Sequence, residues 1–231
     1  MIAITSDIDW ATDEVIQDTI DLFQKYNVKC TLFCTHDTNV IKKSNRDLFE
    51  IAIHPNFNNT LNGSSNKRPN EIIEEIFKIY PEAEGVRSHS LTNSTPLLNL
   101  FSKFGFKYVS NTIIPYSNNI EITKLWNNMI SIPINWEDDV HMMYENSFEN
   151  SKLQINQNNL NVFNFHPIHV YLNTEKISDY ENAKRFYNAP KKLKKYIDTK
   201  TIGTRDLLIN LLEDCQKQKL ATYKMNELID N

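Results

Sequence analysis

The chain has 231 residues, of which 40% are hydrophobic and 23% charged, a balance typical of a globular protein with one sizeable core. Its net charge of −4 gives no electrostatic basis for nucleic-acid binding, and its four glycines form no phosphate-binding loop. No stretch reaches the roughly 18 apolar residues of a membrane-spanning helix. The first residues form too short an apolar run for a secretory leader, and we expect none. We therefore expect a cytoplasmic protein.

Short apolar runs alternate with helical patterns along the sequence. Strands are predicted at residues 2–5, 28–34, 49–53, 85–87, 107–110, 130–134, 160–165 and 221–225. Helices are predicted at residues 13–26, 71–80, 96–104 and 205–217, a loop at 56–70, and an insertion at 173–200. The alternation predicts a single α/β domain over residues 1–231 with a mostly parallel sheet of seven or eight strands. A (β/α) barrel is the preferred arrangement, and an open doubly wound sheet is the alternative.

Reactive side chains follow most of the predicted strands. The clusters are Asp7-Ile8-Asp9-Trp10, His54-Pro55-Asn56, Arg87-Ser88-His89-Ser90, Trp136-Glu137-Asp138-Asp139 with His141, and His166-Pro167-Ile168-His169. Because the carboxyl ends of parallel strands meet at one face of such a fold, we expect these clusters to share one cleft.

The chemistry of these clusters is that of a divalent-metal hydrolase. Carboxylate and imidazole ligands suit zinc, and also iron, manganese or cobalt. An ion held by three protein groups with one open position activates water, and a second carboxylate beside it accepts the proton. Asp7 and Asp9 are spaced so that one can bind the ion while the other acts as base.

In their order, the clusters resemble the motifs of the polysaccharide deacetylase family (carbohydrate esterase family four). Thr5-Ser6-Asp7-Ile8-Asp9 resembles the first motif, T-F-D-D, which implies that Asp7 is the catalytic base and Asp9 a metal ligand. Ile8 separates the two acids, a departure from the motif. Arg87 matches the arginine of the third motif, R-x-P-[FY], which orients the base. Phe165-His166-Pro167 resembles the fifth motif, which implies that His166 is the general acid.

The second motif, H-[ST]-x-x-H, is incomplete in this sequence. His54 matches its first histidine, whereas Asn58 stands in place of the second. His89 occupies the proline position of the third motif, at the end of a neighbouring strand. We therefore predict Asp9, His54 and His89 as the metal ligands. The alternative is that His89 only forms hydrogen bonds with Ser88, Ser90 or a loop carbonyl.

Trp136-Glu137-Asp138-Asp139 resembles the fourth motif, and Asp138 is expected to be catalytic. The acid that holds His166 protonated is expected to be Glu137, Asp138 or Asp139. The expected substrate-binding residues are Trp10, Asn58, Trp136 and His169. The resemblance extends to a divergent branch associated with surface-polysaccharide (O-antigen) synthesis. It implies a deformed (β/α) barrel, a divalent ion such as Zn²⁺, and the removal of an N-acetyl or N-formyl group from a carbohydrate or nucleotide-sugar substrate.

Two other functions are compatible with parts of the sequence. A metal-free, non-catalytic protein on the same fold is the first, in which Trp10, Trp136 and Tyr171 would stack on a sugar. A magnesium-dependent phosphatase of the haloacid dehalogenase type is the second, with Asp7 as nucleophile. The phosphatase would leave the histidines at the strand ends unexplained.

Overall fold

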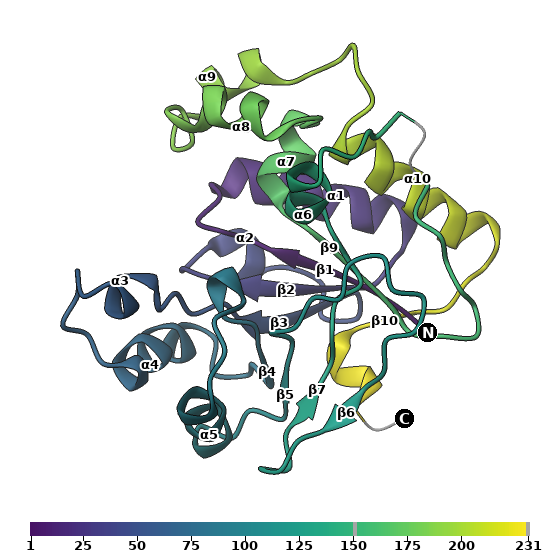
Figure 1. Ribbon diagram of the computed structural model, residues 1–231. Helices are drawn as coiled ribbons and strands as arrows, with labels where there is room; N and C mark the ends of the chain where they lie inside the picture. Colours follow the sequence, from purple (N-terminus) through teal and green to yellow (C-terminus); the bar gives the residue numbers. More distant parts are fainter. Residues whose placement is uncertain (150–151, 230–231) are drawn as a thin grey trace.

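The computed structural model describes residues 1–149 and 152–229, and a single curled sheet runs through it (Figure 1). The strands are β1 (Ile2–Asp7), β2 (Cys30–Cys34), β3 (Phe49–Ile53), β4 (Gly85–Val86), β5 (Tyr108–Val109), β6 (Thr123–Lys124), β7 (Ile130–Ser131), β8 (Trp136–Glu137), β9 (Asn161–Phe165) and β10 (Thr222–Tyr223). Their order is β6-β7-β5-β4-β3-β2-β1-β9-β8, with β10 paired to β1.

The sheet curls toward closure without becoming a regular barrel. All pairs of strands are parallel except β6 and β7, which are antiparallel. An isolated parallel bridge between Ile113 and Ile134 links the chain after β5 to the chain before β8. This arrangement confirms the predicted deformed α/β barrel, although very short strands bring the number of strands in the described residues to ten.

The helices lie outside the sheet (Figure 1). They are α1 (Asp13–Tyr26), α2 (Asn39–Lys42), α3 (Asn58–Leu61), α4 (Pro69–Ile79), α5 (Thr95–Lys103), α6 (Asp138–Met143), α7 (Pro167–Leu172), α8 (Ile177–Lys184), α9 (Pro190–Leu193) and α10 (Thr204–Lys217), with short 3₁₀ helices η1 (His89–Leu91), η2 (Lys194–Tyr196) and η3 (Met225–Leu228). Helices α1, α7 and α10 pack against one another on the β1–β9 side. In the described part of the chain, no helix is both long enough and apolar enough to cross a membrane.

The sequence pattern explains the best-predicted elements. Helix α1 buries Val15, Ile16, Ile20 and Phe23, which recur at helical spacing. It ends at Asn27, which adopts the left-handed conformation (φ 53°) and closes the last turn with its backbone N–H. Strands β1, β2, β3 and β9 are buried along their whole length, as expected for strands covered on both faces.

Several predicted boundaries are wrong for local reasons. Residues 130–134 form no continuous strand: β7 stops at Ser131, and Pro133 separates it from β8 because proline cannot donate a ladder hydrogen bond. The predicted loop at 56–70 contains α3 and the start of α4. Residues 173–200 include α8, α9 and η2 and lie over the carboxyl end of β1 (Figure 1), and their interpretation as an insertion stays a prediction.

Candidate active site

The chain makes a sharp turn directly after β1, and this turn presents Asp7 and Asp9 to the same cleft. Asp9 and Trp10 both have positive φ angles, 35° and 57°. Non-glycine residues adopt this conformation at a cost of about 1–3 kcal/mol, which the surrounding structure must offset. Asp7 stays at the end of the strand with 3% of its surface exposed, whereas the Asp9 carboxylate turns toward two histidines.

Asp9, His54 and His89 form a compact group of metal-ligand type. Asp9 Oδ1 lies 3.2 Å from His54 Nε2 and 3.2 Å from His89 Nδ1. One ligand atom from each residue lies within 4.8 Å of the other two. Burial opposes ionisation of Asp9, but hydrogen bonds from His54 and then His89 hold its pKa well below the usual value.

The donor set of this triad suits a divalent ion. Two imidazole nitrogens and one carboxylate oxygen are the ligands of a catalytic zinc site that keeps one position open. Asn58 is not part of the triad. Its side-chain amide donates to Ser90 Oγ at 3.1 Å. The geometry thus fits the predicted exchange of ligands, with His89 in place of the missing motif histidine, and the assignment itself stays a prediction.

A buried arginine fixes Asp7. Arg87 is fully buried, and its Nη1 donates to Asp7 Oδ1 at 2.7 Å and to Asn164 Oδ1 at 2.7 Å. Its Nε and Nη2 donate to the backbone oxygen and the hydroxyl of Ser110. Burial would raise the pKa of Asp7, but the Arg87 guanidinium lowers it below the usual value. The carboxylate is therefore ionised and oriented, and its Oδ2 lies 3.8 Å from His54 Nε2.

His166 follows β9 and is held by Asp138, the first residue of α6. Asp138 Oδ1 lies 2.6 Å from His166 Nδ1, and Asp138 Oδ2 accepts the His166 backbone N–H at 2.8 Å. Burial would lower the pKa of His166, but Asp138 and then Asp139 raise it well above the usual value. The imidazole is therefore a cation whose Nε2 faces the cleft, 3.8 Å from Asp9 Oδ2.

The structure adds residues that the sequence did not single out. Asn164 is fully buried, accepts from Arg87 and donates to Asp7 Oδ2 at 3.2 Å and to Glu137 Oε2 at 3.2 Å. An asparagine in the middle of the otherwise largely apolar strand Asn161–Phe165 is the signal that pointed to it, because buried polar groups need partners. Burial also raises the pKa of Glu137 to about 7.

The segment after β9 covers one side of the site. The Tyr187 hydroxyl donates to the backbone oxygen of Asp9, and the Tyr180 ring lies 4.9 Å from that of His169. The segment that contains these two tyrosines, residues 173–200, has weak helical periodicity, so the sequence did not predict their position. His169 Nε2 in turn lies 2.8 Å from Asp139 Oδ1, so that Asp139, His166 and His169 form a second group with ligand atoms within 4.8 Å.

The predicted substrate-binding residues have different surroundings. Trp10 is 41% exposed and borders the metal-ligand triad, its ring 5.2 Å from that of His89. A pocket of about 310 Å³ opens there, lined by Trp10, His54 and Lys67 among others. His169 is buried beside Asp139. Trp136 is buried and lies on the other face of β8, directed away from the triad; its indole N–H donates to His141.

Comparison with known proteins places this arrangement in a family. A family model described as WbmS-like polysaccharide deacetylase matches residues 4–184. A crystal structure from Bordetella bronchiseptica, described as a proposed polysaccharide deacetylase involved in O-antigen biosynthesis, is similar with a TM-score of 0.86 and 37% identity. The similarity covers 92% of this chain and 89% of that one. No curated protein sequence matches at a significant level.

More distant structures share the fold alone. The Bc1960 peptidoglycan N-acetylglucosamine deacetylase is 12% identical, with a TM-score of 0.56 over 100% of this chain and 88% of that chain. The 4-α-glucanotransferase from Thermococcus litoralis is 9% identical, with a TM-score of 0.52 over 99% of this chain and 38% of that chain. The family model covers most of the sequence and includes every residue of the site described above except Tyr187. This chain therefore belongs to the WbmS-like polysaccharide deacetylase family.

Proposed function

We propose that this protein is a metal-dependent carbohydrate N-deacylase that removes an acetyl or formyl group from a sugar in surface-polysaccharide biosynthesis. The observation that carries the proposal is the placement of an ionised Asp7 and a cationic His166 beside the Asp9–His54–His89 triad. The family supports the deacetylase activity, and the relative described for O-antigen biosynthesis supports the class of substrate. Zinc as the ion and the cytoplasm as the location are parts of the same proposal.

The residues divide the hydrolysis between them. A divalent ion held by Asp9, His54 and His89 would polarise the amide carbonyl as a Lewis acid. Asp7, fixed by Arg87, takes a proton from the attacking water as the carbon–oxygen bond forms. His166 donates its Nε2 proton to the departing amine as the carbon–nitrogen bond breaks. Because Asp138 occupies Nδ1, the proton on Nε2 is the one available to the substrate.

Neither alternative function has comparable support. The phosphatase interpretation is at odds with the family model over residues 4–184. The metal-free interpretation rested on the missing histidine at Asn58, and His89 now offers a nitrogen close to Asp9 in its place.

The metal site is tested by elemental analysis of purified protein. We expect wild type to contain one transition-metal ion per chain, His54→Ala and His89→Ala to lose it to a similar degree, and Asn58→Ala to retain it. Asn58 is the matched control because it lies next to the site without joining the triad. Retention of the ion by both histidine variants would place the metal elsewhere.

The catalytic roles are tested by acyl release. N-acetylated and N-formylated nucleotide sugars serve as probes, and proton NMR detects free acetate or formate. His166→Ala should keep its metal while turnover falls roughly 10²–10⁴-fold, the usual contribution of a positioned proton donor. Unchanged turnover in this variant would remove His166 from the mechanism. A wild type without metal that binds these sugars and releases no acid would favour the non-catalytic alternative.

A further inference from the structure

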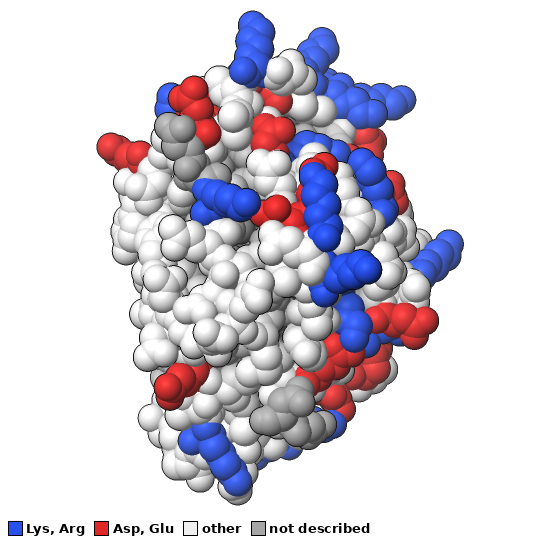
Figure 2. Space-filling view, turned by 90° about the vertical axis from the view of Figure 1, so that its right-hand side faces the viewer, with Lys and Arg blue, Asp and Glu red and all other residues white. Residues whose placement is uncertain are grey.

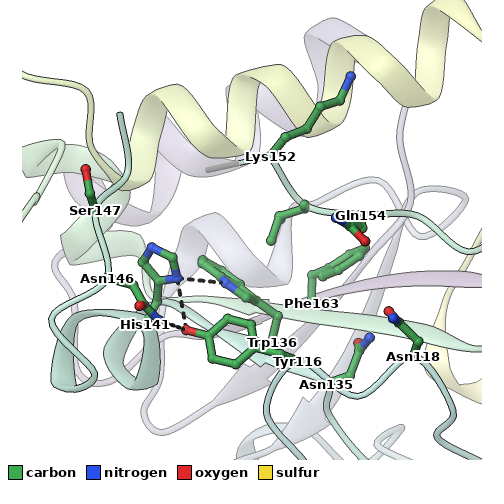
Figure 3. Close-up of a pocket in the computed structure, with 11 residues that line it drawn as sticks. Tyr116, Asn118, Asn135, Trp136, His141, Asn146, Ser147, Lys152, Gln154 and Phe163 are labelled. Atoms are coloured by element: carbon green, nitrogen blue, oxygen red, sulfur yellow. Dashed lines mark hydrogen bonds between the residues drawn. The ribbon is translucent and has the colours of Figure 1, made fainter. Parts of the chain in front are cut away.

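Figure 3 shows a second pocket, of about 430 Å³, which is lined by Trp136 of β8 and by none of the three residues of the metal-ligand triad. Neighbouring residues of a strand point to opposite faces. Glu137 accepts a hydrogen bond from Asn164 in the active site, whereas Trp136, one residue earlier, lines this pocket. Helix α6 contributes to both sides, because Asp138 holds His166 and His141 lines the pocket.

One wall of the pocket consists of aromatic rings in fixed positions. The indole N–H of Trp136 lies 3.3 Å from His141 Nδ1, and the Tyr116 hydroxyl lies 3.1 Å from the same atom. Indole nitrogen can only donate, so His141 Nδ1 is an acceptor, and its single lone pair is shared between the Trp136 N–H and the Tyr116 hydroxyl. Asn146 Nδ2 donates to the Tyr116 oxygen at 2.7 Å. Tyr116 is thereby oriented by two neighbours while 44% of its surface stays exposed.

The wall is also uncharged. An accepting Nδ1 means that His141 is neutral, and burial lowers its pKa, which favours the neutral form. Residues 111–120 and 153–165, which include Asn118 and Gln154 of the lining, contain no Asp, Glu, Lys or Arg. The other lining segment, residues 135–147, contains four acidic residues, and none of them is among the residues that line the pocket. Figure 2 views the molecule from this side and shows a broad area without charged side chains. The one cationic residue in the lining, Lys152, pairs with Asp214 at 3.0 Å.

Carboxamides face the aromatic wall. Asn118 and Gln154 are exposed residues of the lining and lie toward the opposite side of the pocket in Figure 3. A carboxamide carries both donors and an acceptor, so it can pair with neighbouring hydroxyl groups of one ligand. An aromatic face packs against an apolar C–H surface. A pyranose ring presents both of these surfaces, and an anion would find no unpaired cation among the lining residues that the structure describes.

We propose that this pocket is a second, non-catalytic site that binds one neutral sugar residue, with Tyr116 stacking on the ring and Asn118 and Gln154 contacting its hydroxyl groups. Its volume lies within the range of about 300–1,000 Å³ that small-molecule sites occupy. Binding at this site is independent of catalysis. Its use for another residue of the same glycan rests on the proposed deacylase function, because only then does the metal-ligand triad bind a neighbouring sugar.

The test is a titration of isotope-labelled full-length protein with N-acetylglucosamine and with glucose, followed by NMR of indole and side-chain amide N–H groups. Trp→Phe variants identify the three indole signals. We expect the Trp136 signal and the Asn118 and Gln154 amides to shift, and the shift to persist in His54→Ala protein. Failure of the deacylase proposal would leave this result unchanged.

Variants locate the site. Tyr116→Ala should weaken sugar binding roughly tenfold, as expected for loss of a stacking surface, and Gln154→Ala should weaken it less. Trp126→Ala is the matched control, an exposed aromatic residue outside the pocket lining. If Tyr116→Ala does not fold, the sugar affinity of Gln154→Ala, compared with that of wild type, tests the proposal. The proposal is wrong if the sugars do not bind, if only the Trp10 signal shifts, or if the pocket variants bind sugar as tightly as wild type. It is also wrong if glucose 1-phosphate binds more tightly than glucose.

Discussion

Two buried carboxyl groups inside the curled sheet have pKa values that are shifted in opposite directions. Asp7 ends β1, and Glu50 is the second residue of β3; they are 3% and 6% exposed. Burial raises the pKa of both. At Asp7 the guanidinium of Arg87 reverses this effect and lowers the pKa. Among the described residues, no cation forms an ion pair with Glu50, and its pKa rises to about 7.

The hydrogen-bond donors around Glu50 are neutral. Thr31 Oγ1 and Tyr108 Oη each donate to it at 2.8 Å, and the backbone N–H of Asn226 donates at 3.0 Å. Three neutral donors only partly compensate for burial of the charge. In this sheet a paired cation keeps a buried carboxylate ionised, whereas neutral hydrogen-bond donors alone leave its pKa raised. Asp7, the candidate base, is paired with Arg87, whereas the partners of Glu50 described above are neutral.

The largest effect on the two carboxyl groups is expected from removing the cation beside Asp7. Arg87→Leu leaves Asp7 buried and unpaired, and we expect a loss of about 3–5 kcal/mol in the free energy of unfolding at neutral pH. Urea denaturation measures this loss. A double variant with Asp7→Asn should recover part of the stability, because no charge then remains unpaired. A loss below about 1 kcal/mol in Arg87→Leu would mean that water reaches Asp7.

Glu50→Gln removes the carboxyl group whose pKa is raised. Because the pKa of Glu50 in the folded state is about 7, above the 4.5 of an ordinary Glu, the folded state binds more protons between these values. Its contribution to stability is therefore full below pH 4.5 and is lost as the pH rises to about 7. Glutamine has no proton to lose, so at pH 8 the variant should be more stable than wild type by up to about 3 kcal/mol.

Denaturation at a series of pH values checks this prediction through the difference between the two proteins. The difference should vanish near pH 4 and reach a plateau above pH 7. Glu121→Gln, at an exposed position, is the control and should show no such trend. A constant difference at all pH values would show that Glu50 does not titrate in this range.

The same two carboxyl groups show what the sequence predicts and where it stops. Asp7, Asp9, His54, His89 and His166 each follow an apolar strand, so the rule that strand ends converge was enough to group them. Glu50 lies within a strand and its partners come from β2, β5 and η3. Such partnerships depend on strand order and on the path of the chain end, which local periodicity does not encode.

The covering residues of the active site illustrate the same limit. Asn164 had a local signal, as a polar residue in a buried strand. Tyr180 and Tyr187 had none, because the segment that contains them has weak periodicity and its position over Asp9 depends on tertiary packing. Trp136 belongs to the segment that resembles the fourth motif. Because neighbouring residues of a strand point to opposite faces, however, Trp136 lies on the other face of β8 from Glu137.

The smallest predicted effect concerns one of the neutral donors. Tyr108→Phe removes the hydroxyl that donates to Glu50 Oε1 and keeps the buried ring. We expect a loss of about 0.5–1.5 kcal/mol in the free energy of unfolding at pH 8, the usual net worth of one hydrogen bond. The hydrogen bond lowers the pKa of Glu50, so its removal should raise that pKa further and shift the pH-dependent loss of stability upward. In the Glu50→Gln background no charge remains to be stabilised, and the same substitution should cost less. Equal costs in the two backgrounds would show that the Tyr108 hydroxyl acts on folding without regard to the charge on Glu50.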